Sequence, residues 1–91
     1  MKKILVFCCV ILCSAVALHA QDKLKIYISA DMEGVVGAVT GEQLGPSGFE
    51  YQRFREFMTQ EVLTAIAAAR EAGATEILVS DSHGNGQNLL I

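Results

Sequence analysis

The sequence predicts an α/β fold in which a parallel-sheet βαβ unit forms the N-terminal part of a larger three-layer α/β domain. Three features indicate it: alternating side chains over residues 24–30, a helical apolar stripe between residues 50 and 72, and a second apolar run over residues 75–80. Two strands joined through a helix are expected to be parallel, with a right-handed crossover. Because one such unit leaves a sheet face and both sheet edges uncovered, we expect the domain to continue beyond Ile91.

The first predicted strand covers residues 24–30 (LKIYISA), where large apolar residues occupy every second position. It ends abruptly at Asp31. Residues 31–48 then contain five glycines and the only proline, Pro46, which predicts a long loop. Long loops in compact domains tend to carry function, so this segment is a candidate for part of a site.

A long helix follows, and Ser47 with Glu50 has the spacing of a capping box at its start. The helix is predicted to run to about Ala72, because Gly73 is a typical stop signal. Its apolar residues recur every three or four positions, which indicates a face directed toward the core. They are Phe54, Phe57, Met58, Val62, Ala65, Ile66 and Ala69.

The second predicted strand covers residues 75–80 (TEILVS) and gives way to a polar loop over residues 81–86 (DSHGNG). The final residues, 87–91, contain an apolar run that suggests the start of another element.

Residues 1–20 have the layout of a secretory signal peptide: Lys2 and Lys3, an apolar stretch, and small residues near the end. Cleavage is expected after Ala17 or after Ala20, and the alternative is an uncleaved N-terminal anchor. We therefore expect an exported protein, periplasmic or secreted, with no stable membrane span once the signal peptide is removed.

The remaining segment, residues 21–91, is predicted to be the metallopeptidase-like part of the chain described below. Cys8, Cys9 and Cys13 all lie in the signal segment, which excludes a disulfide-stabilised mini-protein and a thiolate zinc finger. Removing residues 1–20 takes away two of the seven basic residues and none of the ten acidic ones, leaving a net charge of −5. An acidic body without a basic cluster argues against a nucleic-acid partner.

Candidate ligands for a metal ion follow both predicted strands. Asp31 and Glu33 come after the first strand, and an extended chain would project both carboxylates to the same side. His83 follows the second strand, and the carboxyl ends of parallel strands lie at one edge of a sheet, where ligands bind. Two carboxylates and an imidazole suit zinc, with manganese as the alternative. Such an ion would activate a water molecule for hydrolysis.

Each of these residues also has a plainer interpretation. Asp31 could cap a turn, Glu33 could be a solvated loop residue, and His83 could be a turn histidine bonded to Asp81. Ser82 and His83 form a weak candidate for a nucleophile and base, because adjacent side chains seldom face one another and the nucleophile-elbow motif is missing. A metal-dependent phosphohydrolase using the same acidic cluster remains an alternative function.

Two motifs together resemble the DppA-type D-aminopeptidases, zinc metallopeptidases of bacteria and archaea. The first is SADMEG at residues 29–34, and the second is EILVSDSHG at residues 76–84, followed by Asn88-Leu89. The predicted helix is also similar to the family's first long helix, at Tyr51, Arg55, Met58, Thr59 and Glu61. The resemblance covers residues 24–91.

The resemblance implies a zinc-dependent aminopeptidase that removes N-terminal D-amino acids, such as D-alanine, from short peptides, with two zinc ions in its site. Asp31 would bridge the two ions, Glu33 would bind one and His83 the other. The family's remaining ligands, a histidine and a glutamate, and its catalytic histidine would lie beyond Ile91, so no catalytic residue is assigned within this chain.

The resemblance also implies a homo-oligomer for the full-length protein. Because the chain carries only three of the implied ligands, the alternative to a peptidase is a catalytically incomplete metal-binding fragment with no turnover.

Overall fold

The computed structural model describes residues 22–91. The predicted signal peptide, residues 1–20, lies outside the described residues. Within the part of the chain that is described, no helix is both long enough and apolar enough to cross a membrane.

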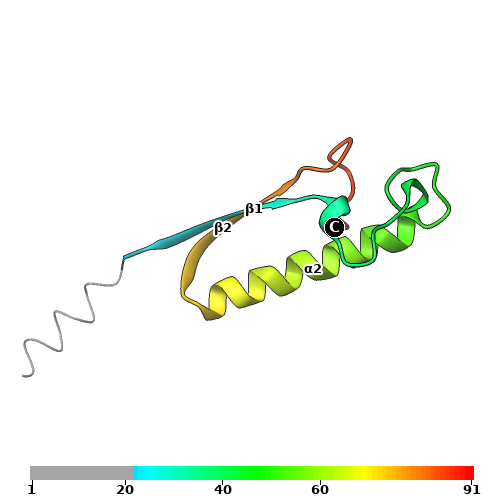
Figure 1. Cartoon of the computed structure of the whole chain (residues 1–91). Coiled ribbons are helices and arrows are strands. Elements are labelled where there is room, and N and C mark those ends of the chain that lie inside the picture. The colour runs from blue at the N-terminus through cyan, green and yellow to red at the C-terminus, as the bar shows by residue number, and fades with distance from the viewer. Residues whose placement is uncertain (1–21) are drawn as a thin grey trace, which may run out of the picture.

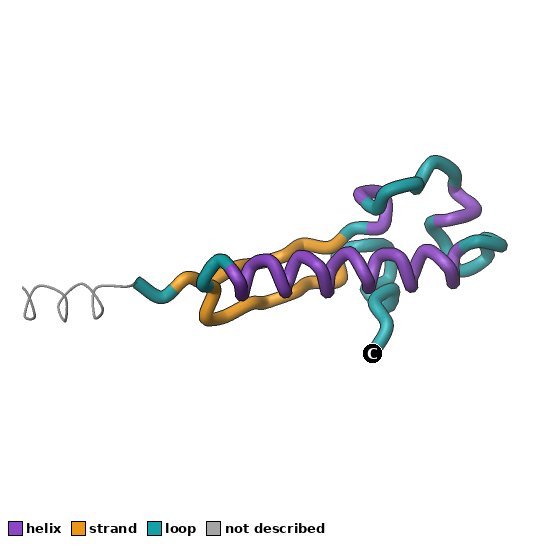
Figure 2. Tube along the Cα trace, turned by 90° about the horizontal axis from the view of Figure 1, so that it is seen from below, coloured by secondary structure: helices purple, strands orange, loops and turns teal. Residues whose placement is uncertain are grey.

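Strands β1 (Leu24–Ala30) and β2 (Ala74–Asp81) form a two-stranded parallel sheet. Their pairing runs from Leu24 opposite Ala74 to Ala30 opposite Asp81, with one irregularity next to Leu24. Helix α2 (Tyr51–Glu71) connects them and lies along one face of the sheet (Figures 1 and 2). The predicted α/β class and the parallel βαβ order are therefore confirmed, and both strands end at the same edge of the sheet.

The predicted start of the helix is wrong in its detail. Glu50 is the N-cap residue of α2, and neither it nor Ser47 caps the helix with its side chain. The Glu50 carboxylate instead accepts a hydrogen bond from the Gln43 amide at 3.2 Å. Gln43 belongs to the short 3-10 helix η2 (Gly41–Gln43), and its Oε1 accepts the backbone N–H of Thr40. A capping box therefore forms at the start of η2 and not at the start of α2.

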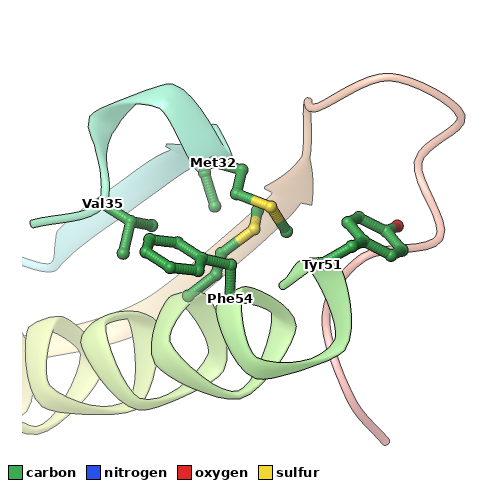
Figure 3. Packing of buried hydrophobic residues seen from close by; sticks show 6 residues of the cluster. Met32, Val35, Tyr51 and Phe54 are labelled. Atoms are coloured by element: carbon green, nitrogen blue, oxygen red, sulfur yellow. The ribbon is translucent and has the colours of Figure 1, made fainter. Parts of the chain in front are cut away.

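The core lies between the start of α2 and the carboxyl ends of the strands (Figure 3). Met32 and Met58 are almost completely buried, with 0% and 1% exposure, and Phe54 is buried beside them. The prediction that Phe57 lies in the core is wrong. Phe57 is 37% exposed and stacks edge-on against Phe54, with the Arg53 guanidinium over its ring. The buried cluster consists of Ala30, Met32, Val35, Tyr51, Phe54 and Met58.

The segment between β1 and α2 folds back on itself rather than forming an open loop. It contains η1 (Met32–Gly34) and η2, and its return to the helix passes very close to its own backbone at Gly48. The N–H of Glu50 donates to the carbonyl of Glu42 at 3.1 Å, which closes this turn. Residues 87–91, expected to begin another element, contain no helix or strand.

Replacing Gly48 with alanine is expected to disrupt this turn. A Cβ atom at Gly48 would lie 2.1 Å from the carbonyl oxygen of Glu42, so the backbone must move. We expect the free energy of unfolding, measured by urea denaturation, to fall by about 2 kcal/mol. Gly45→Ala is the matched control, because open space surrounds that position. Equal stabilities of the two variants would contradict the close approach.

Candidate metal centre

The two carboxylates of the site are brought together by a tight turn. The sequence-based expectation placed both carboxylates on one side of an extended chain. After β1 the chain instead enters η1, where the N–H of Gly34 donates to the carbonyl of Asp31 at 3.0 Å. Met32 lies at the start of this turn, and its side chain is fully buried in the core. Asp31 and Glu33 on either side of it point away from the core, and each carboxylate side chain is 55% exposed.

The third member of the site follows β2. The N–H of Ser82 donates to the carbonyl of Ala30 at 2.8 Å, which continues the strand pairing one step past the end of the sheet. The next residue, His83, places its ring between the two carboxylates, with Nδ1 3.0 Å from Oδ1 of Asp31 and 2.8 Å from Oε2 of Glu33. The structure thus brings together the three residues predicted as metal ligands, whose donor atoms all lie within 4.8 Å of one another.

The other ring nitrogen of His83 is also engaged. Nε2 lies 2.6 Å from the carbonyl oxygen of Leu44, in the loop that follows η2. A backbone carbonyl can only accept, so Nε2 carries a proton, and Nδ1 is the atom that remains for the carboxylates or for a metal ion. The ring side chain is only 8% exposed, which restricts it to this orientation. Sequence analysis missed Leu44, because its contribution is a main-chain atom.

The charge balance of the cluster favours a positive charge at Nδ1. Burial lowers the pKa of His83, but the hydrogen bonds to the Leu44 carbonyl, Glu33 and Asp31 outweigh it, and the net pKa lies above its ordinary value. The contact with Glu33 and the neighbouring His83 ring hold the pKa of Asp31 below its ordinary value, against the opposing effect of desolvation. Two carboxylates and one imidazole nitrogen around a single position are donors that fit a zinc or manganese ion.

The plainer interpretation of His83, a turn histidine bonded to Asp81, does not match the geometry. The Asp81 carboxylate does not bind the His83 ring: it accepts the backbone N–H groups of Asn88 and Leu89 at 2.6 and 2.8 Å. Burial raises the pKa of Asp81, but these bonds and the one from the Asn88 side chain outweigh it, and the net pKa is lowered. The charged Asp81 carboxylate therefore stabilises the loop that follows β2 and does not contact the His83 ring.

The Ser82 hydroxyl does not face His83 either. It lies 2.8 Å from the Ser29 hydroxyl and 3.1 Å from the Ser80 hydroxyl, on the edge of the sheet. A nucleophile and base formed by Ser82 and His83 is therefore not supported.

The chain is similar to known proteins over the whole region that contains the site. The family model described as D-aminopeptidase matches residues 24–91. A D-aminopeptidase of Bacillus subtilis is 40% identical over 68 residues, which are 75% of this chain and 25% of that protein.

A solved structure gives the same similarity in three dimensions. It is the Zn-dependent D-aminopeptidase DppA from Bacillus subtilis, described as a self-compartmentalizing protease, and it matches with a TM-score of 0.72 at 40% identity. The match covers 75% of this chain and 25% of that structure's chain. This chain thus spans about a quarter of the length of the relatives that it matches.

The raised pKa of His83 makes the stability of the metal-free chain depend on pH. Because protonated His83 is the form that both carboxylates bind, its stabilisation is complete below the unfolded-state pKa of about 6.5 and is lost as the pH rises through the higher folded-state pKa. In EDTA, we expect the free energy of unfolding to fall as the pH rises above about 6.5, because the folded-state pKa lies above that value. His83→Asn should remove this dependence, and a parent chain whose stability rises over this pH range would contradict it.

Proposed function

This chain belongs to the D-aminopeptidase family, and we propose that it acts in a zinc-dependent aminopeptidase that removes N-terminal D-amino acids, such as D-alanine, from short peptides. The observation that carries the proposal is the position of His83 Nδ1, within hydrogen-bond distance of both Asp31 and Glu33. Zinc is the preferred ion because the matching Bacillus subtilis structure is of a Zn-dependent enzyme.

Asp31, Glu33 and His83 would hold the metal. When bound, zinc supplies a water molecule with a lowered pKa and a positive charge that polarises a substrate carbonyl. If two ions share the site, as the family resemblance implies, Asp31 would contact both, and Glu33 and His83 would contribute one ligand each.

The chain's own residues determine how this site is presented. The Leu44 carbonyl holds the proton on Nε2 of His83 and keeps Nδ1 directed at the carboxylates. The imidazole is buried while both carboxylate side chains are 55% exposed, so the cluster is rigid on its inner side and accessible from the outside. Access from one side is what a peptide substrate requires.

We further propose that the full-length protein assembles as a homo-oligomer and that it works outside the cytoplasm. The first proposal is supported by the description of the matching structure as self-compartmentalizing. The second is supported by the signal-peptide layout of residues 1–20. Outside the cytoplasm, D-alanine-containing peptides released from the cell wall are the corresponding substrate class.

In the full-length protein, removing any one of the three proposed ligands is expected to weaken zinc binding and D-peptide hydrolysis together. We expect Asp31→Ala, Glu33→Ala and His83→Ala to weaken zinc binding by more than the roughly 10–100-fold typical of losing an outer-shell partner. Metal analysis and hydrolysis of D-alanyl peptides are the measurements. Glu76→Gln is the control, because this carboxylate pairs with Lys25 on the sheet surface. Absence of zinc in the full-length parent protein, or unchanged hydrolysis after Asp31→Ala, would reject the proposal.

Export predicts a processed N-terminus. When the chain is produced in a bacterial host, mass spectrometry of the periplasmic fraction should find a protein that begins at Leu18 or at Gln21. Recovery from the cytosol alone, with Met1 retained, would contradict it.

A further inference from the structure

We propose that Asn88 is a positioning residue for the metal ligand His83, acting through the main chain of the loop that carries the ligand. The inference rests on the proposed metal-binding function. Asn88 lies five residues after His83 and is 1% exposed, the most deeply buried polar residue of the described chain. Its burial calls for a complete set of hydrogen-bond partners.

The side-chain amide of Asn88 makes three hydrogen bonds. Its Nδ2 donates to the carbonyl oxygen of His83 at 2.5 Å and to Oδ1 of Asp81 at 2.9 Å. Its Oδ1 accepts the hydroxyl of Tyr51. The opposite amide orientation would turn Oδ1 toward a carbonyl and a carboxylate, which are both acceptors, so the partners allow one orientation.

These bonds close the loop between Asp81 and Asn88 around the ligand. Oδ2 of Asp81 accepts the N–H of Asn88 at 2.6 Å, which joins the two ends of the loop. The carbonyl of His83 accepts the N–H of Gly86 at 3.0 Å as well as the Asn88 amide. With both lone pairs of this carbonyl in use, the peptide unit that follows the His83 side chain has a fixed direction.

The loop is in turn fastened to the first turns of α2. Tyr51 begins the helix, and in Figure 3 its ring points from the buried cluster toward the C-terminal segment. One turn later, Nε of Arg55 donates to the carbonyl oxygen of Asn88 at 3.0 Å. Asn88 therefore contacts the helix through both its side chain and its main chain, and its side-chain amide bonds the carbonyl of His83.

A metal ligand has to be held within roughly 0.5 Å of its productive position. Nε2 of His83 is held by Leu44, but a single bond to the end of the ring leaves the backbone of the ligand free to shift. Asn88 supplies the second point of attachment, at the main chain. Its loss is expected to weaken metal binding and to distort the coordination of the ion that still binds.

The test compares four variants of the full-length protein with the parent. Asn88→Ala removes the amide, and Asn88→Asp keeps its shape but replaces the Nδ2 donor with an acceptor. Tyr51→Phe removes only the hydroxyl that orients the amide. Asn85→Ala is the matched control: it lies in the same loop, and its side chain accepts only the nearby N–H of Gln87 among the described contacts.

Zinc affinity is measured by competition with a chelator, and the visible absorption of bound Co²⁺ reports the geometry of the site. Both are measured where circular dichroism shows each variant folded. We expect Asn88→Ala and Asn88→Asp to lose about 10–100-fold in zinc affinity and to change the Co²⁺ bands. Tyr51→Phe should show a smaller loss with the same change of bands, and Asn85→Ala should match the parent.

The outcomes separate the inference from the proposed function. If the parent binds zinc but the Asn88 and Tyr51 variants keep its affinity and Co²⁺ bands, the inference is overturned and the proposed function stands. A lower affinity with unaltered Co²⁺ bands would also overturn it, because a purely structural role lowers the folded fraction without changing the bound site. A full-length parent protein that binds neither ion overturns both.

Discussion

The parallel pairing of β1 with β2 is the constraint on which the rest of the structure depends. It sets Ala30 opposite Asp81, so the residues that follow the two strands leave the sheet at one edge. The Ser82-to-Ala30 hydrogen bond extends the pairing by one residue and delivers His83 to the carboxylates of Asp31 and Glu33. A shift by one residue would invert the facing of every side chain on one strand and separate these groups.

Two buried amides convert this framework into a defined site. Gln43 organises the loop after β1, where its Oε1 accepts the N–H groups of Val39 and Thr40 at 2.6 and 2.9 Å. The carbonyl of the next residue, Leu44, accepts a hydrogen bond from Nε2 of His83. Asn88 organises the loop after β2. Among the described residues that are not exposed, every buried side-chain nitrogen or oxygen has a hydrogen-bond partner. Such networks specify one arrangement, because each lost partner leaves a buried polar group unsatisfied.

The sequence predicted the elements better than the contacts between them. Periodicity located β1 from Leu24 to Ala30 as observed and β2 within one residue at each end, because it reports which face of a strand is buried. The rule that parallel strands end at one edge of a sheet predicted that Asp31, Glu33 and His83 lie together. The two carboxylates reach His83 through the η1 turn and not through an extended chain.

The contacts that escaped prediction have two physical causes. Glu50 and Ser47 have capping-box spacing, but the Glu50 carboxylate is taken by Gln43, a tertiary partner that local spacing does not reveal. Leu44 contributes a carbonyl, a group that every residue possesses, so no residue type marks it. Local pattern thus identifies candidate ligands, whereas the residues that orient them emerge only from the fold.

The different exposure of the three side chains in the cluster follows from their charges. A buried imidazolium needs carboxylate partners, and two carboxylates side by side need either solvent or a cation. His83 accordingly lies on the inner side, and Asp31 and Glu33 remain half exposed. In the metal-free chain, the protonated His83 ring is the cation that lies between the two carboxylates. A metal ion bound at Nδ1 would compete with that proton for the same lone pair, so the proposed site and the metal-free ion pair are alternative states of one cluster.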